Sequence, residues 1–306
     1  MKILVTGANG LLGQNLVYEL FLRGFTVIAT GKGDCRFDYS GSQTVRYYPL
    51  DIASPQDWKR LQELETGFDQ VIHGAALTQV DYCEMNKEEA EAVNVGAVQL
   101  LIDQFAPSGT PIVYVSTDFV FNGEKGNYSE EDDTDPVNWY GQTKQKAENL
   151  IKQYTGPWSI ARTCLVYGNV RYGNRSNIIS WVKDNLEQGK PIKVVSDQWR
   201  TPTFVQDLAI GIALMVTQRV TGVFHISGDE MMSPYEMALR TAQHFGLNEG
   251  LIERVDASVF SQPGKRPPKT GFNITKAKQV LHFQPRSFSE GLMVMSQNNA
   301  GNSSPH

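Results

Sequence analysis

Apolar and polar positions follow two alternating patterns through the first 168 residues of the chain. Short apolar runs, typical of buried strands, are separated by segments whose apolar residues recur every three or four positions, as in amphipathic helices. Because strands that alternate with helices are joined by right-handed crossovers, this pattern predicts an α/β fold with a doubly wound parallel sheet. The expected strands are residues 3–5, 25–30, 44–50, 69–76, 111–117 and 158–168.

Helices are expected between these strands. The first begins at Leu11, directly after a glycine-rich turn. The next follows Ser54, which can cap it, and has Pro55 at its first position, where the missing N–H costs nothing. Longer helical patterns cover about 88–105 and begin again near Tyr140.

The pattern becomes looser after Gly168. A helix is expected over 177–189, and short strands and helices then mix as far as residue 297. We therefore expect a first domain over 1–168 and a smaller C-terminal α/β lobe over 169–297, with some crossing of the chain between them. This lobe would cover the C-terminal edge of the sheet, where ligands of such sheets bind. Residues 298–306 are polar and without periodicity, and are expected to be disordered.

Three glycines lie between the first strand and the first helix, in the stretch "TGANGLLG". A strand, a tight turn and a helix N-terminus together form an anion site, because the first turn of a helix leaves its N–H groups unpaired. Gly7 would allow the tight turn, Gly10 would let a pyrophosphate approach the backbone, and Gly13 would let helix and strand pack closely. The turn favours a Rossmann-type dinucleotide-binding domain over 1–168, and an ordinary glycine-rich turn is the alternative.

Composition narrows the function classes. The chain has 306 residues, is 41% hydrophobic and 20% charged, and carries a net charge of −5, which is typical of a globular protein that binds neither nucleic acid nor an anionic membrane. Met1 and Lys2 run straight into the first strand, so no secretory leader is expected, and no apolar stretch reaches the roughly 18 to 20 residues of a membrane helix. Three widely spaced cysteines indicate reduced thiols in a cytoplasmic protein. No cluster has metal-ligand spacing, and His73 and His225 lie in apolar runs typical of core histidines.

The most informative pair of side chains is Tyr140 and Lys144. Four residues apart on a helix, they share one face. An ammonium beside a phenol would lower the phenol's pKa and make it a proton donor and acceptor near neutral pH. The pair follows the fifth strand, whose last residues, Ser116 and Thr117, could offer a hydroxyl to the same substrate oxygen. An ordinary exposed Tyr and Lys pair is the alternative.

The stretches "TGANGLLG", "HGAA", "STDFVFNG" and "YGQTK" resemble the extended short-chain dehydrogenase/reductase family. Within it the chain is most similar to the dTDP-4-dehydrorhamnose reductases, through "STDFVFNGEKGNYSEEDDTDPVNWYGQTK", "ARTCLVYG" and "VVSDQWRTPTFVQDLA". The resemblance covers residues 1 to about 290. A regulatory NADP-binding subunit of methionine adenosyltransferase shares much of the pattern. Residues 270–273 depart from the S-x-L-D-like segment of the rhamnose-pathway reductases, which puts the sugar specificity in question more than the chemistry.

The resemblance implies three catalytic residues. Tyr140 would protonate a carbonyl oxygen while hydride arrives from a nicotinamide, and Lys144 would hold the nicotinamide ribose and tune Tyr140. Thr117 would donate a hydrogen bond to the developing alkoxide. Related dehydratases carry an acidic pair after this threonine, whereas here Asp118 is followed by Phe119, which favours reduction over dehydration.

The cofactor expected from the end of the second strand is NADPH. Sites that prefer NADH place a carboxylate there, but this strand ends in Thr30 and Gly31, with Lys32 and Arg36 within reach. Asp34 keeps NADH possible, and a solvated loop is the alternative for the two cations. The residues expected to bind the cofactor, besides Tyr140 and Lys144, are Gly7, Asn9, Gly10, Leu11, Leu12, Gly13, Lys32, Arg36, Asp51, Ile52, Ala75, Ala76 and Thr78.

The expected partner is a small nucleotide-linked sugar. Arg200 and Arg266 could neutralise its diphosphate or be paired with structural carboxylates, and Trp199 could stack on its base or pack in the core. The expected substrate-binding residues are Val80, Asp81, Thr117, Asp118, Asn177, Trp199, Arg200 and Arg266. The resemblance implies NADPH-dependent reduction of the C4 keto group of a 4-keto-6-deoxy sugar. The alternatives are a non-catalytic NADP-binding regulatory subunit and a sugar-nucleotide epimerase. A homodimer is possible, and some relatives carry a metal at such an interface.

Overall fold

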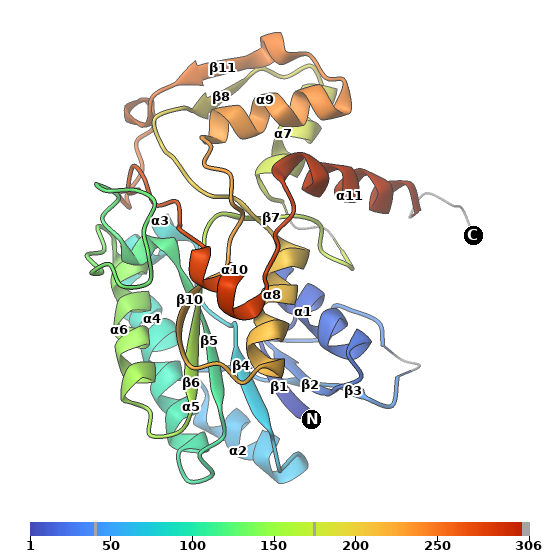
Figure 1. Ribbon diagram of the computed structural model, residues 1–306, viewed down its shortest axis with the longest axis vertical. Coiled ribbons are helices and arrows are strands. Elements are labelled where there is room, and N and C mark those ends of the chain that lie inside the picture. Colours follow the sequence, from blue (N-terminus) through green and yellow to red (C-terminus); the bar gives the residue numbers. More distant parts are fainter. Residues whose placement is uncertain (40–41, 174–175, 302–306) are drawn as a thin grey trace.

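A seven-stranded parallel sheet forms the centre of the computed structural model, which describes residues 1–39, 42–173 and 176–301 (Figure 1). The strand order is β10-β6-β5-β4-β1-β2-β3, and each pair of neighbours is parallel. The predicted doubly wound sheet is therefore confirmed. Its strands are β1 (Lys2–Thr6), β2 (Thr26–Gly31), β3 (Val45–Pro49), β4 (Gln70–His73), β5 (Ile112–Thr117), β6 (Trp158–Thr163) and β10 (Gly222–His225).

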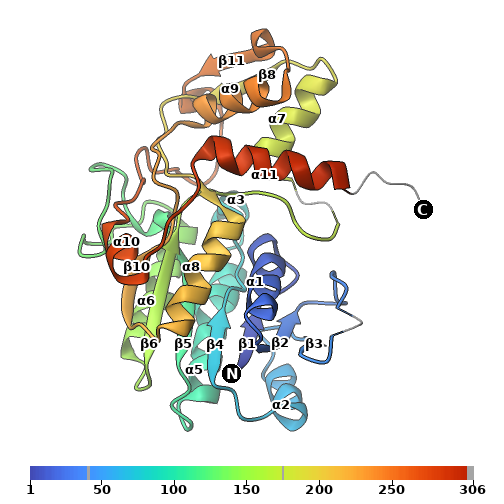
Figure 2. The same ribbon diagram turned by 45° about the vertical axis from the view of Figure 1, so that its right-hand side comes forward.

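Helices cover both faces of this sheet (Figure 2). Successive side chains of a strand point to opposite faces, so Val5 of β1 joins one apolar cluster and Leu4 joins the other. The first cluster includes α1 (Leu11–Leu22), α8 (Val205–Thr217) and α10 (Thr275–Leu281). The second includes α2 (Pro55–Leu64), α5 (Ala97–Phe105) and α6 (Trp139–Gln153). As predicted, Ser54 caps α2, accepting a hydrogen bond from the backbone N–H of Asp57.

The C-terminal lobe lies beyond the carboxyl ends of the central strands (Figure 1). Its described residues form a two-stranded parallel sheet, three α-helices and two short 3₁₀ helices, and its apolar residues form separate clusters. Later parts of the chain also return to the central sheet, where β10 is an edge strand and α8 and α10 pack on one face. The elements of the lobe are α7 (Ile178–Glu187), β8 (Ile192–Val195), α9 (Pro234–Phe245), η3 (Glu249–Leu251), β11 (Ile252–Val255), η4 (Ala257–Val259) and α11 (Phe288–Gly301).

Two predicted elements are divided in the structure. The strand expected over 158–168 ends at Thr163, because Leu165 takes a left-handed backbone conformation with φ of 38°. The chain then forms β7 (Val166–Tyr167), which pairs with β9 (Thr203–Phe204). The helix expected over 88–105 consists of α4 (Lys87–Glu91), the π-helical turn η1 (Ala92–Gly96) and α5.

The C-terminal end differs from the expectation of disorder over 298–306. Helix α11 continues to Gly301, and residues 302–306 lie outside the described residues. Within the described part of the chain, no helix combines the length and the apolar character needed to span a membrane.

Candidate active site

A cavity of about 730 Å³ lies at the carboxyl ends of the central strands, between the sheet and the C-terminal lobe. Parallel sheets bind their ligands at this edge. The cavity brings together most of the residues that the sequence analysis selected. These are Gly7, Asn9, Gly10, Leu11, Leu12, Gly13, Lys32, Ala75, Ala76, Thr78, Val80, Thr117, Asp118, Tyr140, Lys144, Asn177, Arg200 and Arg266.

Five selected residues are not among those that line it: Arg36, Asp51, Ile52, Asp81 and Trp199. The backbone N–H of Trp199 donates to the carbonyl of Pro268, 2.7 Å away. Of the two alternatives for Trp199, stacking on a base has no support in the wall of the cavity, because Trp199 does not line it. The carboxylate of Asp51 pairs with Lys32, and that of Asp81 pairs with Arg266.

The glycine turn has the geometry of a phosphate cradle. Gly7 has φ of 74°, and a Cβ placed there would lie 2.8 Å from the backbone nitrogen of Ala75. A Cβ on Gly13 would lie 2.1 Å from the carbonyl oxygen of Gly7, so helix and strand touch where Gly13 stands. Gly10 offers no side chain to cap α1, which leaves the first-turn N–H groups of the helix to an anion. The turn therefore fits the pyrophosphate of a dinucleotide.

Tyr140 and Thr117 are held together by the start of α6. Asn138 caps this helix, accepting a hydrogen bond from the N–H of Gly141 at 2.8 Å. A Cβ on Gly141 would lie 2.1 Å from the carbonyl oxygen of Phe119, so α6 begins in contact with the short helix η2 (Asp118–Val120) that follows β5. This contact brings the side chain of Tyr140 within hydrogen-bonding reach of Thr117.

The lowered pKa expected for Tyr140 is not found. Burial raises its pKa well above the ordinary value, and the hydrogen bond from Thr117 opposes this only in part. Lys144 is directed elsewhere: its Nζ donates to the carbonyl of Val115 at 2.8 Å and lies 4.1 Å from the ring centre of Tyr114. Burial lowers the pKa of Lys144 to about 7, against the effect of the nearby Glu148 carboxylate. The cost of burying the charged ammonium of Lys144 therefore outweighs its attraction to the Glu148 carboxylate, four residues further along α6.

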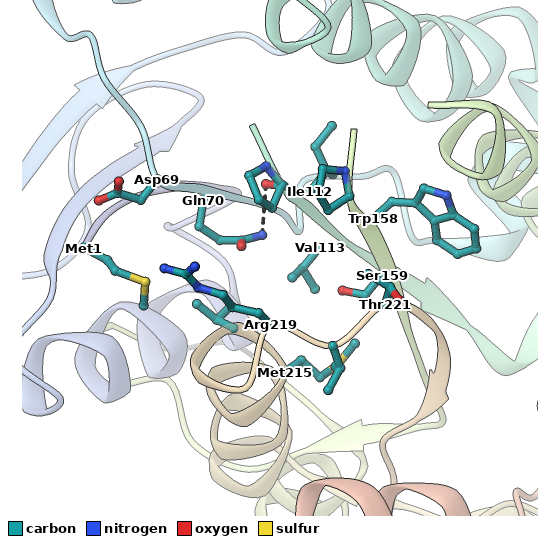
Figure 3. A pocket seen from close by; sticks show the side chains of 14 residues that line it. Met1, Asp69, Gln70, Ile112, Val113, Trp158, Ser159, Met215, Arg219 and Thr221 are labelled. Carbon is teal, nitrogen blue, oxygen red and sulfur yellow. Dashed lines mark hydrogen bonds between the residues drawn. The ribbon is translucent and has the colours of Figure 1, made fainter. Parts of the chain in front are cut away.

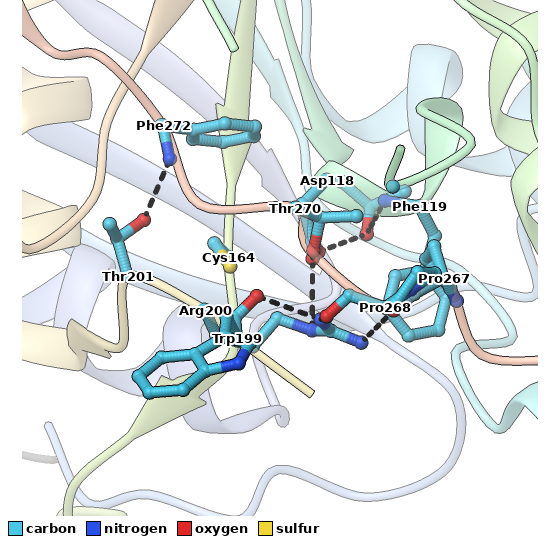
Figure 4. A network of polar contacts seen from close by, with 12 residues as sticks. Asp118, Phe119, Cys164, Trp199, Arg200, Thr201, Pro267, Pro268, Thr270 and Phe272 are labelled. Carbon is cyan, nitrogen blue, oxygen red and sulfur yellow. Dashed lines mark hydrogen bonds and ion pairs between the residues drawn. The ribbon is translucent and has the colours of Figure 1, made fainter. Parts of the chain in front are cut away.

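Asp118 and Arg200 form a buried network that ties β5 to the C-terminal lobe (Figure 4). The Asp118 carboxylate accepts from Thr117 at 3.2 Å and from the hydroxyl of Thr270, and lies 3.6 Å from Nε of Arg200. The Arg200 guanidinium also donates to the carbonyl oxygens of Trp199, Pro267 and Pro268. Only 4% of Arg200 is exposed. Its donors are thus used within the protein, which favours the structural pairing that the sequence analysis left open.

Arg266 keeps access to the cavity. Its guanidinium makes a two-pronged contact with the Asp81 carboxylate, with Nη2 and Oδ2 2.7 Å apart. The N–H of Gly264 donates to the same carboxylate at 3.1 Å. Asp81 belongs to α3 (Val80–Met85), so this pair joins the first domain to the segment that carries Arg266. Asn177 lies nearby in the wall, where its side chain caps α7 and donates to the carbonyl of Gly168 at 2.7 Å.

Other contributors were not found from the sequence. Asn94, in the π-helical turn, accepts from the N–H of Leu77 at 2.8 Å and donates to the hydroxyl of Thr143 at 3.0 Å. It thereby holds the segment after β4 against helix α6, but a π-helical turn leaves no trace in the hydrophobic pattern. Glu148 forms a buried ion pair with Arg162. It lies four residues after Lys144, and this spacing on a helix could have indicated that the two side chains lie close together.

Both singled-out histidines are buried and bonded. His73 contacts the hydroxyl of Thr6 at 2.9 Å, and His225 contacts the carbonyl of Tyr128 at 3.1 Å. Burial lowers the pKa of each to about 3, so both are neutral core residues, as expected. Within the described residues, no group of His, Cys, Asp and Glu side chains is arranged to hold a metal ion.

A second cavity, of about 440 Å³, lies at the opposite ends of the strands (Figure 3). Its walls carry mainly apolar side chains, and the side-chain amide of Gln70 donates a hydrogen bond to the carbonyl of Pro111 at 2.9 Å. None of the residues selected from the sequence lines it. The chemistry-bearing side chains are therefore gathered in the cavity at the carboxyl ends of the strands.

Comparison with known proteins gives consistent matches along the chain. The RmlD substrate binding domain family model matches residues 1–300. The probable low-salt glycan biosynthesis reductase Agl14 of Haloferax volcanii is 30% identical, over 96% of this chain and 97% of its own length. Methionine adenosyltransferase 2 subunit beta of Xenopus tropicalis is 28% identical, over 95% and 86%. The crystal structure of dTDP-4-dehydrorhamnose reductase from Bacillus anthracis in complex with NADP has a TM-score of 0.81 and 27% identity, over 97% and 98%.

Proposed function

The chain belongs to the RmlD substrate binding domain family, and from this membership and its cavity we propose an NADPH-dependent reductase of a nucleotide-linked 4-keto-6-deoxy sugar. The substrate we propose is dTDP-4-dehydrorhamnose, which would be reduced at C4 to dTDP-rhamnose. The observation that carries the proposal is the meeting of Thr117, Tyr140 and Lys144 in one cavity with the glycine turn. A pyrophosphate cradle without a proton donor would serve binding alone.

The residues act on a carbonyl at C4 of the sugar. NADPH, when bound, supplies the hydride that forms the new C–H bond, and the carbonyl electron pair moves to the oxygen. Tyr140 donates its hydroxyl proton to that oxygen, and the phenolate then takes a proton from solvent. Burial raises the pKa of Tyr140, so the hydroxyl keeps its proton at neutral pH until the far more basic alkoxide develops.

Thr117 and Lys144 support this proton transfer. The hydroxyl of Thr117 donates to the Asp118 carboxylate at 3.2 Å. During the reaction it would turn this one proton to the C4 oxygen and stabilise the negative charge that develops there. Lys144 lies behind Tyr140 on the same helix and holds the nicotinamide ribose. Ala75, Ala76 and Thr78, which follow β4, line the cavity and would contact the cofactor, and Val80 and Asn177 in the same wall would contact the sugar nucleotide.

A non-catalytic regulatory subunit is the second candidate, favoured by the similarity to methionine adenosyltransferase 2 subunit beta. The absorbance of NADPH, followed with a panel of nucleotide-linked 4-keto sugars, separates the two. The proposal predicts consumption of NADPH with dTDP-4-dehydrorhamnose above the rest of the panel. Tight NADPH binding without consumption on any sugar would support the regulatory subunit. An epimerase would convert its sugar with no net consumption.

Cofactor choice provides the first prediction. NADPH should bind more tightly than NADH, because β2 ends in Gly31 without a carboxylate while Lys32 lines the cavity and Arg36 lies in the same loop. Lys32→Ala and Arg36→Ala should each narrow the preference by about three- to tenfold, as expected for partly solvated charge pairs. Fluorescence titration with both cofactors measures this, and Lys59→Ala, an exposed lysine of α2, is the control. A preference for NADH that Asp34→Ala abolishes would show that the loop selects the other cofactor.

The second prediction concerns the substrate diphosphate. Arg266→Ala should raise KM for the nucleotide sugar by about ten- to a hundredfold, since the loss of a charge-assisted partner costs about 1.5–3 kcal/mol. KM for NADPH should stay within about twofold. Arg240→Ala, which removes an exposed arginine paired with Glu230 at 2.7 Å, is the control for lost surface charge. An unchanged KM for the sugar would make Arg266 a purely structural partner of Asp81.

A further inference from the structure

One side chain joins the glycine turn to the loop that follows β2. Asn9 lies between Gly7 and Gly10, and its Nδ2 donates to the carbonyl of Asp34 at 2.9 Å. Its Oδ1 accepts from the N–H of Arg36 at 3.0 Å. The backbone of the loop over 31–36 is thus fastened to the same turn that forms the phosphate cradle.

The hydroxyl of Tyr47 completes this connection from the edge strand β3. It accepts from Nδ2 of Asn9 at 2.8 Å and lies 2.7 Å from the carbonyl oxygen of Gly33 and 2.9 Å from that of Gly31. A hydroxyl has one proton, so it donates to one of these two carbonyls at a time. The Tyr47 ring packs edge-on against Phe37, with ring centres 5.8 Å apart. Tyr47 is not among the residues that line the cavity.

The loop over 31–36 needs these hydrogen bonds to keep one conformation. Gly31 and Gly33 flank Lys32, and glycine loses more conformational freedom on ordering than any other residue. Gly33 takes φ of 72°, and the space beside Gly31 is filled by Asn9 and Tyr47, at 3.1 and 3.3 Å from a Cβ placed there. Because the backbone of this loop is already held in one conformation, only the side chains of Lys32 and Arg36 remain to be ordered when an anion binds between them.

We propose that Tyr47 is a positioning residue that sets the selectivity for the adenosine 2′-phosphate of the cofactor. It acts through Asn9 and the carbonyl of Gly33, which hold the backbone of the loop that carries Lys32, in the wall of the cavity, and Arg36, just outside it. The inference rests on the proposed use of NADPH. It adds that the discrimination depends on a hydroxyl that touches neither cofactor nor substrate.

The test measures the affinities of adenosine 2′,5′-bisphosphate and of AMP, which differ only in the 2′-phosphate, by calorimetry, so that no turnover is needed. Tyr47→Phe keeps the ring and its contact with Phe37 but removes the hydroxyl. It should weaken binding of the 2′-phosphate ligand by about three- to tenfold, as for the loss of one or two hydrogen bonds, and change binding of AMP by less than about twofold. Tyr48→Phe is the matched control, because the neighbouring hydroxyl donates to Glu65 at 2.8 Å instead.

A second variant acts on the loop from the other side. Gly33→Ala meets no atom within 4 Å but forces a side chain into φ of 72°, so it should reproduce the loss of selectivity without changing β3. Equal weakening of both ligands, or of neither, in Tyr47→Phe would overturn the inference while leaving the cofactor proposal intact. A wild-type protein that binds AMP as tightly as the 2′-phosphate ligand would overturn both.

Discussion

Tyr140→Phe should lower kcat by about 10²- to 10⁴-fold, the range typical of losing a positioned general acid. The change removes one hydroxyl and keeps the ring, which packs edge-on against Phe119 with centres 6.0 Å apart. The start of α6 is fixed by Asn138 and Gly141 rather than by the hydroxyl, so the fold and the cofactor site should persist. The dissociation constant of NADPH should therefore change by less than about twofold.

Steady-state kinetics and a cofactor titration on three further proteins complete this comparison. Lys144→Ala should damage both turnover and cofactor binding, because Lys144 is assigned to the ribose. Tyr82→Phe, which removes a surface hydroxyl bonded to Glu89, should change neither. Thr117→Val, which removes the donor to the alkoxide, should lower kcat without weakening NADPH binding. Near-normal turnover in Tyr140→Phe would falsify the assigned proton donor.

Arg162→Met should lower the free energy of unfolding by about 3–5 kcal/mol, the cost typical of leaving one member of a buried ion pair alone. Arg162 is 2% exposed, and its guanidinium donates two hydrogen bonds to the Glu148 carboxylate, with Nε–Oε1 and Nη2–Oε2 distances of 2.9 and 2.7 Å. Ser116 donates to the same carboxylate at 2.6 Å. Burial alone would raise the pKa of Glu148, but these hydrogen bonds hold it below its usual value.

Urea unfolding at neutral pH measures this change. Lys152→Met is the matched control, because it removes another cation beside Glu148, with Nζ 3.6 Å from Oε2. The Lys152 side chain is 38% exposed, so its loss should lower the free energy of unfolding by less than about 1 kcal/mol. The double variant Arg162→Met with Glu148→Leu should recover much of the loss, because no charge is then left buried. Equal stabilities of Arg162→Met and wild type would contradict the account of the pair.

Much of this fold follows from hydrophobic periodicity. The six strands expected before Gly168 are present because each is a short apolar run between turn residues. The seventh, β10, was not assigned to the central sheet, because which sheet a run such as "GVFHIS" joins is a long-range property. The break at Leu165 was missed for a related reason: the left-handed conformation of a leucine is imposed by tertiary packing, and its sequence predicts continued strand.

The candidate site was predictable where strand ends and helix starts decide it. Gly7, Thr117 and Tyr140 meet because parallel strands deliver their carboxyl ends to one edge. The direction of a long side chain is not encoded in spacing. The side chain of Lys144 donates to the carbonyl of Val115 rather than to the phenol of Tyr140. The Arg200 guanidinium donates to three backbone carbonyls and lies beside the Asp118 carboxylate. The contacts of Tyr47 likewise depend on β3 lying beside β2, far along the chain from Asn9.

The most direct test of the central claim follows a deuterium label from the cofactor. The protein is incubated with dTDP-4-dehydrorhamnose and NADPH that carries deuterium at both positions of nicotinamide C4, and the sugar is analysed by mass spectrometry and NMR. The account predicts one deuterium at C4 of the sugar for each NADPH oxidised, in wild type and at a greatly reduced rate in Tyr140→Phe. Bound but unoxidised NADPH together with an unlabelled sugar would contradict it.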